Sequence, residues 1–143
     1  MNRPASVRRL ERSARAAEEL LEQLRTATER AIGALRAADA TLLESALDAR
    51  DILIPLSSAA LEELSLARTA VEPGDPETAR AMLAGTLHAA GELRALDASL
   101  HVALSAVRDQ ARLELRALDQ VEEQTSRYRP LGQGHGTTID LTS

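Results

Sequence analysis

The chain contains no cysteine, tryptophan, phenylalanine or lysine, and only one tyrosine among its 143 residues. The absence of cysteine excludes a disulfide framework, a thiolate nucleophile and metal sites built on cysteine ligands. The longest uncharged stretch between expected loops, Ala81 to Gly91, is far shorter than the roughly 20 residues that cross a bilayer. The basic N-terminus is followed by no apolar run, so it does not resemble a secretory signal. We therefore expect a cytoplasmic protein with no membrane insertion.

The residues that are abundant favour helices. The 27 alanines, 24 leucines, 17 arginines and 14 glutamates make up more than half of the chain, which is typical of long helices or coiled coils. Only five valines and four isoleucines are present, too few to build a sheet. We expect an all-α fold with an aliphatic core, organised as one domain.

The spacing of apolar residues predicts three long helices, at about 5–37, 40–70 and 76–125. Short turns would join them into an antiparallel bundle, and the glycine-rich residues 126–143 would form a flexible tail. In the first helix the apolar residues recur at intervals of three and four, with one threonine in the series; they are Val7, Leu10, Ala14, Ala17, Leu21, Leu24, Thr28, Ala31 and Leu35. Three helices of this size would bury only part of the third.

The helix boundaries differ in how clearly they are marked. Asp39 and Thr41 are both N-cap residue types, and Thr41 with Glu44 fits a capping box, which favours a turn at 36–40. Because no glycine or proline stands there, a single rod of about 50 residues remains an alternative. Pro55 predicts a kink near 52–57. Asp75 followed by Pro76 predicts an N-cap and a first helical residue.

Catalysis and metal binding have little support in the sequence. His88 and His101 lie 13 residues apart, about 140° around a helix, so they cannot hold one metal from the same face. No Glu-x-x-His pattern of di-iron bundles occurs. We therefore expect no enzyme and no cofactor. The net charge of −5 and the absence of lysine also disfavour nucleic acid, since the basic residues concentrate only in the first helix.

Three features resemble the FlgN family of flagellar export chaperones. The stretch from Leu35 to Glu44 resembles the family's Leu-x-x-Gly-Asp turn and leucine-rich second helix, with Ala38 in place of the glycine. Arg50 and Asp51 resemble a charged position midway along that helix. Near the C-terminus, Tyr128 followed by Gly132-Gln133 resembles the family's tyrosine and Gly-Gln, and Ile139-Asp140 in the tail resembles the family's Ile-Asp-like pair.

This resemblance implies a function. Chaperones of the family bind the C-terminal amphipathic helix of hook-associated proteins and deliver these proteins to the flagellar type III export gate. The cargo surface would lie on the third helix, and the tyrosine beyond it would dock to the export gate or to export ATPase components. Carried over to this sequence, the partner-binding residues are Leu100, Val107, Ala111, Leu115, Leu118, Val121 and, for docking, Tyr128.

Two other interpretations stay open at this point. The apolar stripe of a structural coiled-coil protein would be used up in a homodimer. A sibling export chaperone would bind another flagellar or type III substrate. A chaperone leaves part of its third helix free until cargo arrives, so the composition of the purified assembly separates the first of these from the chaperone.

Overall fold

In the computed structural model, the backbone is described for residues 4–142 and the side chains for residues 4–127. Within this part of the chain the fold is all-α, with three long helices: α1 (Ala5–Arg36), α2 (Ala40–Val71) and α3 (Pro76–Thr142). The chain divides into two compact units, residues 1–103 and residues 104–143. The expected fold class is confirmed.

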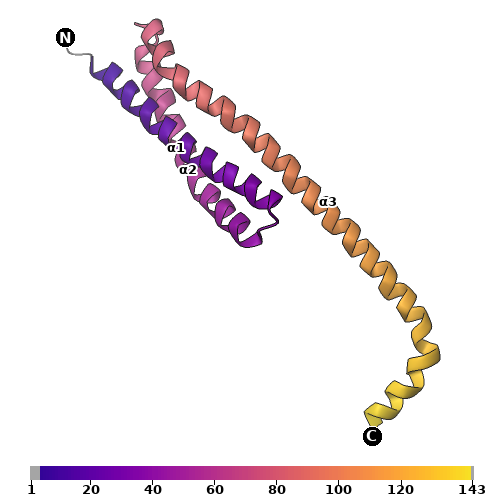
Figure 1. Cartoon of the computed structure of the whole chain (residues 1–143). Helices are drawn as coiled ribbons and strands as arrows, with labels where there is room; N and C mark the ends of the chain where they lie inside the picture. The colour runs from indigo at the N-terminus through magenta and orange to yellow at the C-terminus, as the bar shows by residue number, and fades with distance from the viewer. Residues whose placement is uncertain (1–3, 143) are drawn as a thin grey trace. The chain divides into compact units, whose positions relative to one another are not determined.

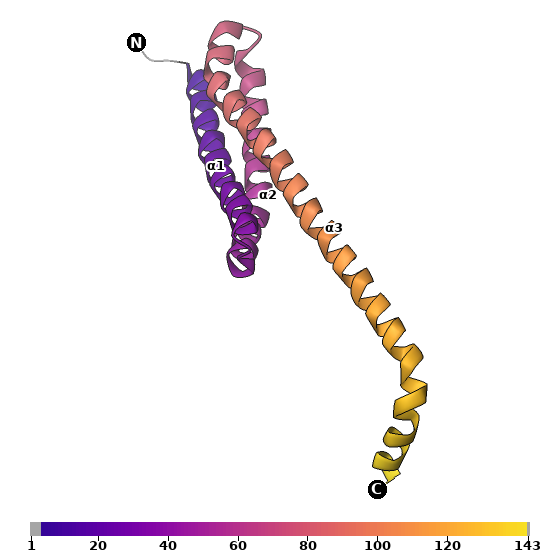
Figure 2. The same ribbon diagram turned by 45° about the vertical axis from the view of Figure 1, so that its right-hand side comes forward.

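Unit 1 consists of α1, α2 and the first part of α3. The helices α1 and α2 lie side by side as an antiparallel hairpin, and residues 76–103 run alongside them (Figures 1 and 2). The apolar side chains that the hairpin and α3 turn inwards form one core cluster of Val7, Leu10, Ala14, Ala17, Leu64, Ala67, Val71 and Ala79. Thr28, which fills the threonine position of the predicted α1 stripe, is also fully buried.

The turn between α1 and α2 confirms the predicted break in the helix. Ala38 has a left-handed φ of 54°. The N–H of Asp39 donates to the carbonyl of Ala34 at 2.9 Å, and the N–H of Ala38 donates to the carbonyl of Leu35 at 3.2 Å. This is the Schellman pattern, in which glycine is the preferred left-handed residue. The chain therefore makes this turn with an alanine at the position where the Schellman motif prefers glycine.

Of the three cap residues that the sequence suggested, Asp39 and Asp75 cap their helices, whereas Thr41 does not. Asp39 caps α2 by accepting from the N–H of Leu42 at 3.0 Å, so the interpretation of Thr41 as the cap is wrong. Asp75 caps α3 as predicted and accepts from the N–H of Thr78 at 3.2 Å and from its hydroxyl at 2.6 Å. These two hydrogen bonds, the one from the hydroxyl first, lower the pKa of Asp75 below its usual value.

The structure agrees with the expected continuity of the second helix and differs from the expected end of the third. The helix α2 continues through Pro55, where both the proline and Asp51, whose carbonyl loses its donor, are exposed residues. A kink there stays a prediction. The helix α3 runs on to Thr142, beyond the expected end near residue 125. The flexibility expected of residues 126–143 stays a prediction, and their side chains from 128 onward lie outside the described part.

Candidate partner-binding surface

The candidate surface lies on the α3 helix of unit 2. Its side chains are exposed: Val107 by 51%, Leu115 by 60%, Leu118 by 59% and Val121 by 58%. Ala111 is exposed as well. We call these five residues the 107–121 face.

The 107–121 face is one side of an amphipathic helix. At about 100° per residue, the five side chains project within a sector of about 120°. The adjacent sector, of about 100°, carries charged residues: Arg108, Asp109, Arg112, Arg116, Asp119, Glu123 and Arg127. Leu113 is as exposed as Leu115, at 58%, but lies about 160° away from it around the helix. An apolar sector beside a charged one is typical of a helix that packs against a partner.

A shallow depression marks the first half of this face. Its walls are Val107, Gln110, Ala111 and Glu114, together with Ala106. The first four residues have the spacing i, i+3, i+4 and i+7. Four residues with this spacing form the hole that receives one side chain of a partner helix in knobs-into-holes packing. The depression is therefore of the kind that a second helix fills.

Glu114 lies within the apolar sector, a feature that the sequence analysis did not single out. It projects between Val107 and Val121 around the helix. The side-chain amide of Gln110 donates to its Oε1 at 3.4 Å. The sequence contained this signal. Position 114 lies three residues after Ala111 and four before Leu118, so it falls in the apolar series but is occupied by a glutamate.

Two further residues that the sequence assigned to this surface, Leu100 and Tyr128, are not part of the 107–121 face as defined above. Leu100 is 1% exposed and belongs to the interior of unit 1, so a partner cannot reach it in this conformation. The side chain of Tyr128 lies outside the described residues. The five remaining residues share one helical face.

A second exposed apolar group occurs in unit 1, on α2. Ile52, Leu56 and Leu66 are exposed by 66%, 50% and 60%. With intervals of four and ten residues they project from one side of the helix, within about 80° of one another. Glu63 projects among them and pairs with Arg9 of α1, Nη2 to Oε1 at 2.8 Å. A salt bridge to α1 thus occupies the middle of this group. No such interhelical salt bridge is found among the described residues of the 107–121 face.

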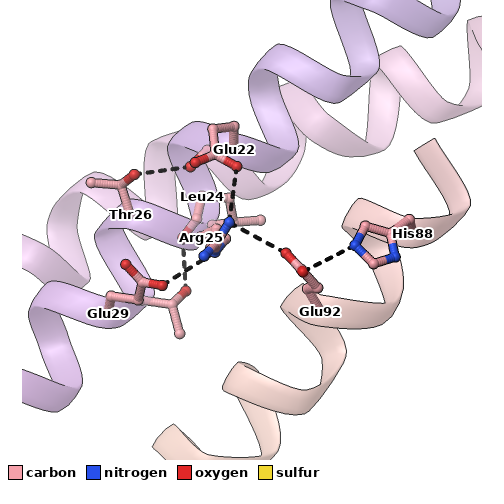
Figure 3. Close-up of polar contacts among 8 residues, drawn as sticks. Glu22, Leu24, Arg25, Thr26, Glu29, His88 and Glu92 are labelled. Carbon is pink, nitrogen blue, oxygen red and sulfur yellow. Dashed lines mark hydrogen bonds and ion pairs between the residues drawn. The ribbon is translucent and has the colours of Figure 1, made fainter. Parts of the chain in front are cut away.

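The polar side chains of unit 1 connect its helices. Arg25 of α1 pairs with Glu92 of α3 at 3.3 Å, and Oε1 of Glu92 lies 3.1 Å from Nε2 of His88 (Figure 3). The carboxylates near Arg25, first Glu22, then Glu92 and Glu29, raise its pKa. Among the described side chains no three His, Asp or Glu residues gather as metal ligands would.

Arg50 forms the most buried of these connections. Its side chain is 15% exposed; its Nε donates to Thr28 Oγ1 at 3.1 Å and its Nη2 pairs with Asp97 of α3. Thr28 in turn donates to the carbonyl of Leu24 at 2.8 Å. Arg50 therefore donates to a buried hydroxyl group and links all three helices. We assign it a role in the stability of unit 1.

No family model matches the chain, and neither a curated protein nor a solved structure matches it. Among the described residues, no helix combines the length and the apolar character that crossing a membrane requires. The surface must therefore be interpreted from its own geometry.

Proposed function

We propose that this protein binds an amphipathic helix of a partner on the 107–121 face and acts as an export chaperone for that partner. The observation that carries the proposal is the contrast within α3: Leu100 is buried in unit 1, whereas the apolar residues from Val107 to Val121 are exposed. Unit 1 has a core of its own, so the exposed face is not needed to complete it. Exposed apolar residues aligned at helical spacing are the feature that helix-binding surfaces use.

The specific cargo that we propose is the C-terminal helix of a flagellar hook-associated protein. The support is the resemblance to FlgN chaperones around Leu35–Glu44 and Tyr128–Gln133, together with the arrangement of a helical hairpin followed by a longer third helix. Covering the cargo helix would prevent its self-assembly before export. In this proposal the protein works in the cytoplasm, without catalysis, a cofactor or nucleic acid.

The test is coexpression of the full chain with the hook-associated proteins of the same organism, with the mass of the purified complex measured by light scattering. A one-to-one complex is expected. A homodimer that binds none of these proteins would overturn the proposal and favour the structural coiled-coil alternative. A one-to-one complex with a different export substrate would assign the protein to a sibling chaperone instead.

A matched pair of substitutions locates the binding surface. Leu115→Asp should reduce cargo affinity by at least about 100-fold, because a charge would enter the apolar interface. Leu113→Asp, an equally exposed leucine on another side of the helix, should change it less than about threefold. Circular dichroism should show the same helicity for both. Equal losses of affinity, or none, would contradict the assignment to the 107–121 face.

Docking to the export apparatus is assigned to Tyr128 in this proposal. Tyr128→Ala should leave cargo affinity unchanged and reduce export of the cargo, measured as secreted hook-associated protein. A loss of cargo affinity in this variant would show that Tyr128 belongs to the cargo site.

A further inference from the structure

The 107–121 face carries one ionisable group in its middle, Glu114, and this group restricts what the face can bind. We propose that the occupant is an amphipathic helix with a lysine or arginine inside its own apolar stripe, positioned to pair with Glu114. The inference rests on the proposed function and adds to it a chemical requirement on the partner. It concerns the register and specificity of binding.

The requirement follows from the cost of covering a carboxylate. Glu114 forms one wall of the depression that a partner side chain would enter, so a docked helix removes it from water. An ionised carboxylate taken out of water without a cation costs several kcal/mol, more than a neutral hydrogen bond returns. Gln110 supplies one neutral donor, to Oε1 at 3.4 Å. A cation from the partner is the group that compensates the remaining charge.

The position of Glu114 also disfavours a second copy of this chain as the occupant. Glu114 lies midway between Val107 and Val121, the ends of the face. In a parallel pair in register, Glu114 faces its own copy. In an antiparallel pair that overlaps the whole face, the same residue again lies opposite itself, because it is central. Both arrangements bury two like charges together. Like charges at a core position of a coiled coil disfavour that pairing of helices.

A single charged core position also fixes register. Apolar stripes slide by one heptad at modest cost, since each hole then receives another apolar side chain. A lysine or arginine that must meet Glu114 allows only one alignment. Glu122, the other carboxylate of this sector, projects between Ala111 and Leu115 around the helix, but it follows Val121 along the axis. It therefore lies at the C-terminal rim of the face, where water solvates it.

The probe is a display library of 21-residue helices with leucine at the apolar stripe positions. In each sub-library, one central stripe position is randomised and the others stay leucine. The full chain, its Glu114→Leu variant and its Leu115→Asp variant serve as baits. The unsubstituted chain should enrich lysine and arginine at one central position at least tenfold over apolar residues. The Glu114→Leu bait should enrich apolar residues there, and the Leu115→Asp bait should retain no sequence.

The selected peptide then permits a charge exchange. Its affinity, measured by fluorescence anisotropy, should fall at least about tenfold with Glu114→Lys and recover when the peptide's cation is replaced by glutamate. Because Glu114 is exposed in the unbound chain, circular dichroism should confirm that the variant keeps its helicity. Recovery distinguishes charge pairing from a general disturbance of the surface.

Four results would overturn the inference. If the unsubstituted chain and the Glu114→Leu variant enrich the same apolar residues, the charge requirement is wrong while the proposed helix-binding function stands. If the Glu114→Lys variant is not rescued by the glutamate peptide, the cation does not meet Glu114. If no peptide is retained, or if retention survives Leu115→Asp, the proposed function at this face fails as well.

Discussion

Two leucines of α3 illustrate how one pattern serves two purposes. Leu100 and Leu115 belong to the same helix and to similar apolar series, yet they are exposed by 1% and 60%. The helices α1 and α2 have 32 residues each, whereas α3 has 67. A hairpin of that length supplies packing partners for only about half of α3. Apolar spacing therefore indicates that a helix face is suited to burial. Whether that face is covered depends on the lengths of the neighbouring helices.

The largest expected effect contrasts these two positions directly. Leu100→Ala should lower the free energy of unfolding by about 2–5 kcal/mol, because it leaves a cavity in unit 1. Leu115→Ala should change it by less than about 0.5 kcal/mol, since that side chain is 60% exposed. Urea denaturation followed by circular dichroism measures both. Equal effects would abolish the distinction between the two regions.

Ion pairs offer a second contrast of intermediate size. Arg50→Ala should cost about 1–2 kcal/mol, because it removes the donor to buried Thr28 as well as the pair with the half-exposed Asp97. Arg127→Ala removes an exposed pair with Glu123 at 3.8 Å and should cost less than about 0.5 kcal/mol. The same denaturation experiment applies. A larger loss for Arg127 would mean that the pairs of unit 2 have partners beyond their own helix.

The turn of unit 1 provides a gain of stability. Ala38→Gly should stabilise the chain by about 0.5–1 kcal/mol, since it relieves the left-handed conformation of an alanine and keeps the Schellman hydrogen bonds. Ala37→Gly is the control: Ala37 has a φ of −86°, so there the added backbone freedom should only destabilise. Cargo affinity should be unchanged in both variants, because the turn lies outside the 107–121 face.

The smallest effect concerns pH and the cap of α3. Because hydrogen bonds from Thr78 lower the pKa of Asp75, its contribution to stability is complete above its unfolded pKa of about 3.9. The contribution is lost as pH falls through the lower folded value. The melting temperature of Asp75→Ala should therefore lie below that of the unsubstituted chain at pH 7, and the difference should shrink near pH 3. A difference that grows on acidification would contradict this assignment.

The sequence predicted the fold better than the exposure of individual residues. The α1 stripe, the break before Ala40 and the Asp75 cap depend on neighbouring residues, so they could be inferred locally. The burial of Leu100 and the partial exposure of Ile54 and Leu61, at 42% and 37%, depend on where another helix passes, which spacing along one helix does not contain. Glu114 could have been found as the polar residue within an apolar series.

The short link at Ala37–Asp39 also bears on the order in which the chain folds as it is synthesised. The hairpin of α1 and α2 closes through residues that are near in sequence at the turn, and such local contacts form quickly. It is complete in sequence before any of α3 leaves the ribosome. Until Ala79 of α3 joins the core cluster, the nascent hairpin exposes the apolar side of Leu10 and Leu64 to the cell. During that interval the hairpin's own apolar side chains are uncovered. A protein proposed to cover a partner's helix therefore passes through a state in which its own helices need covering.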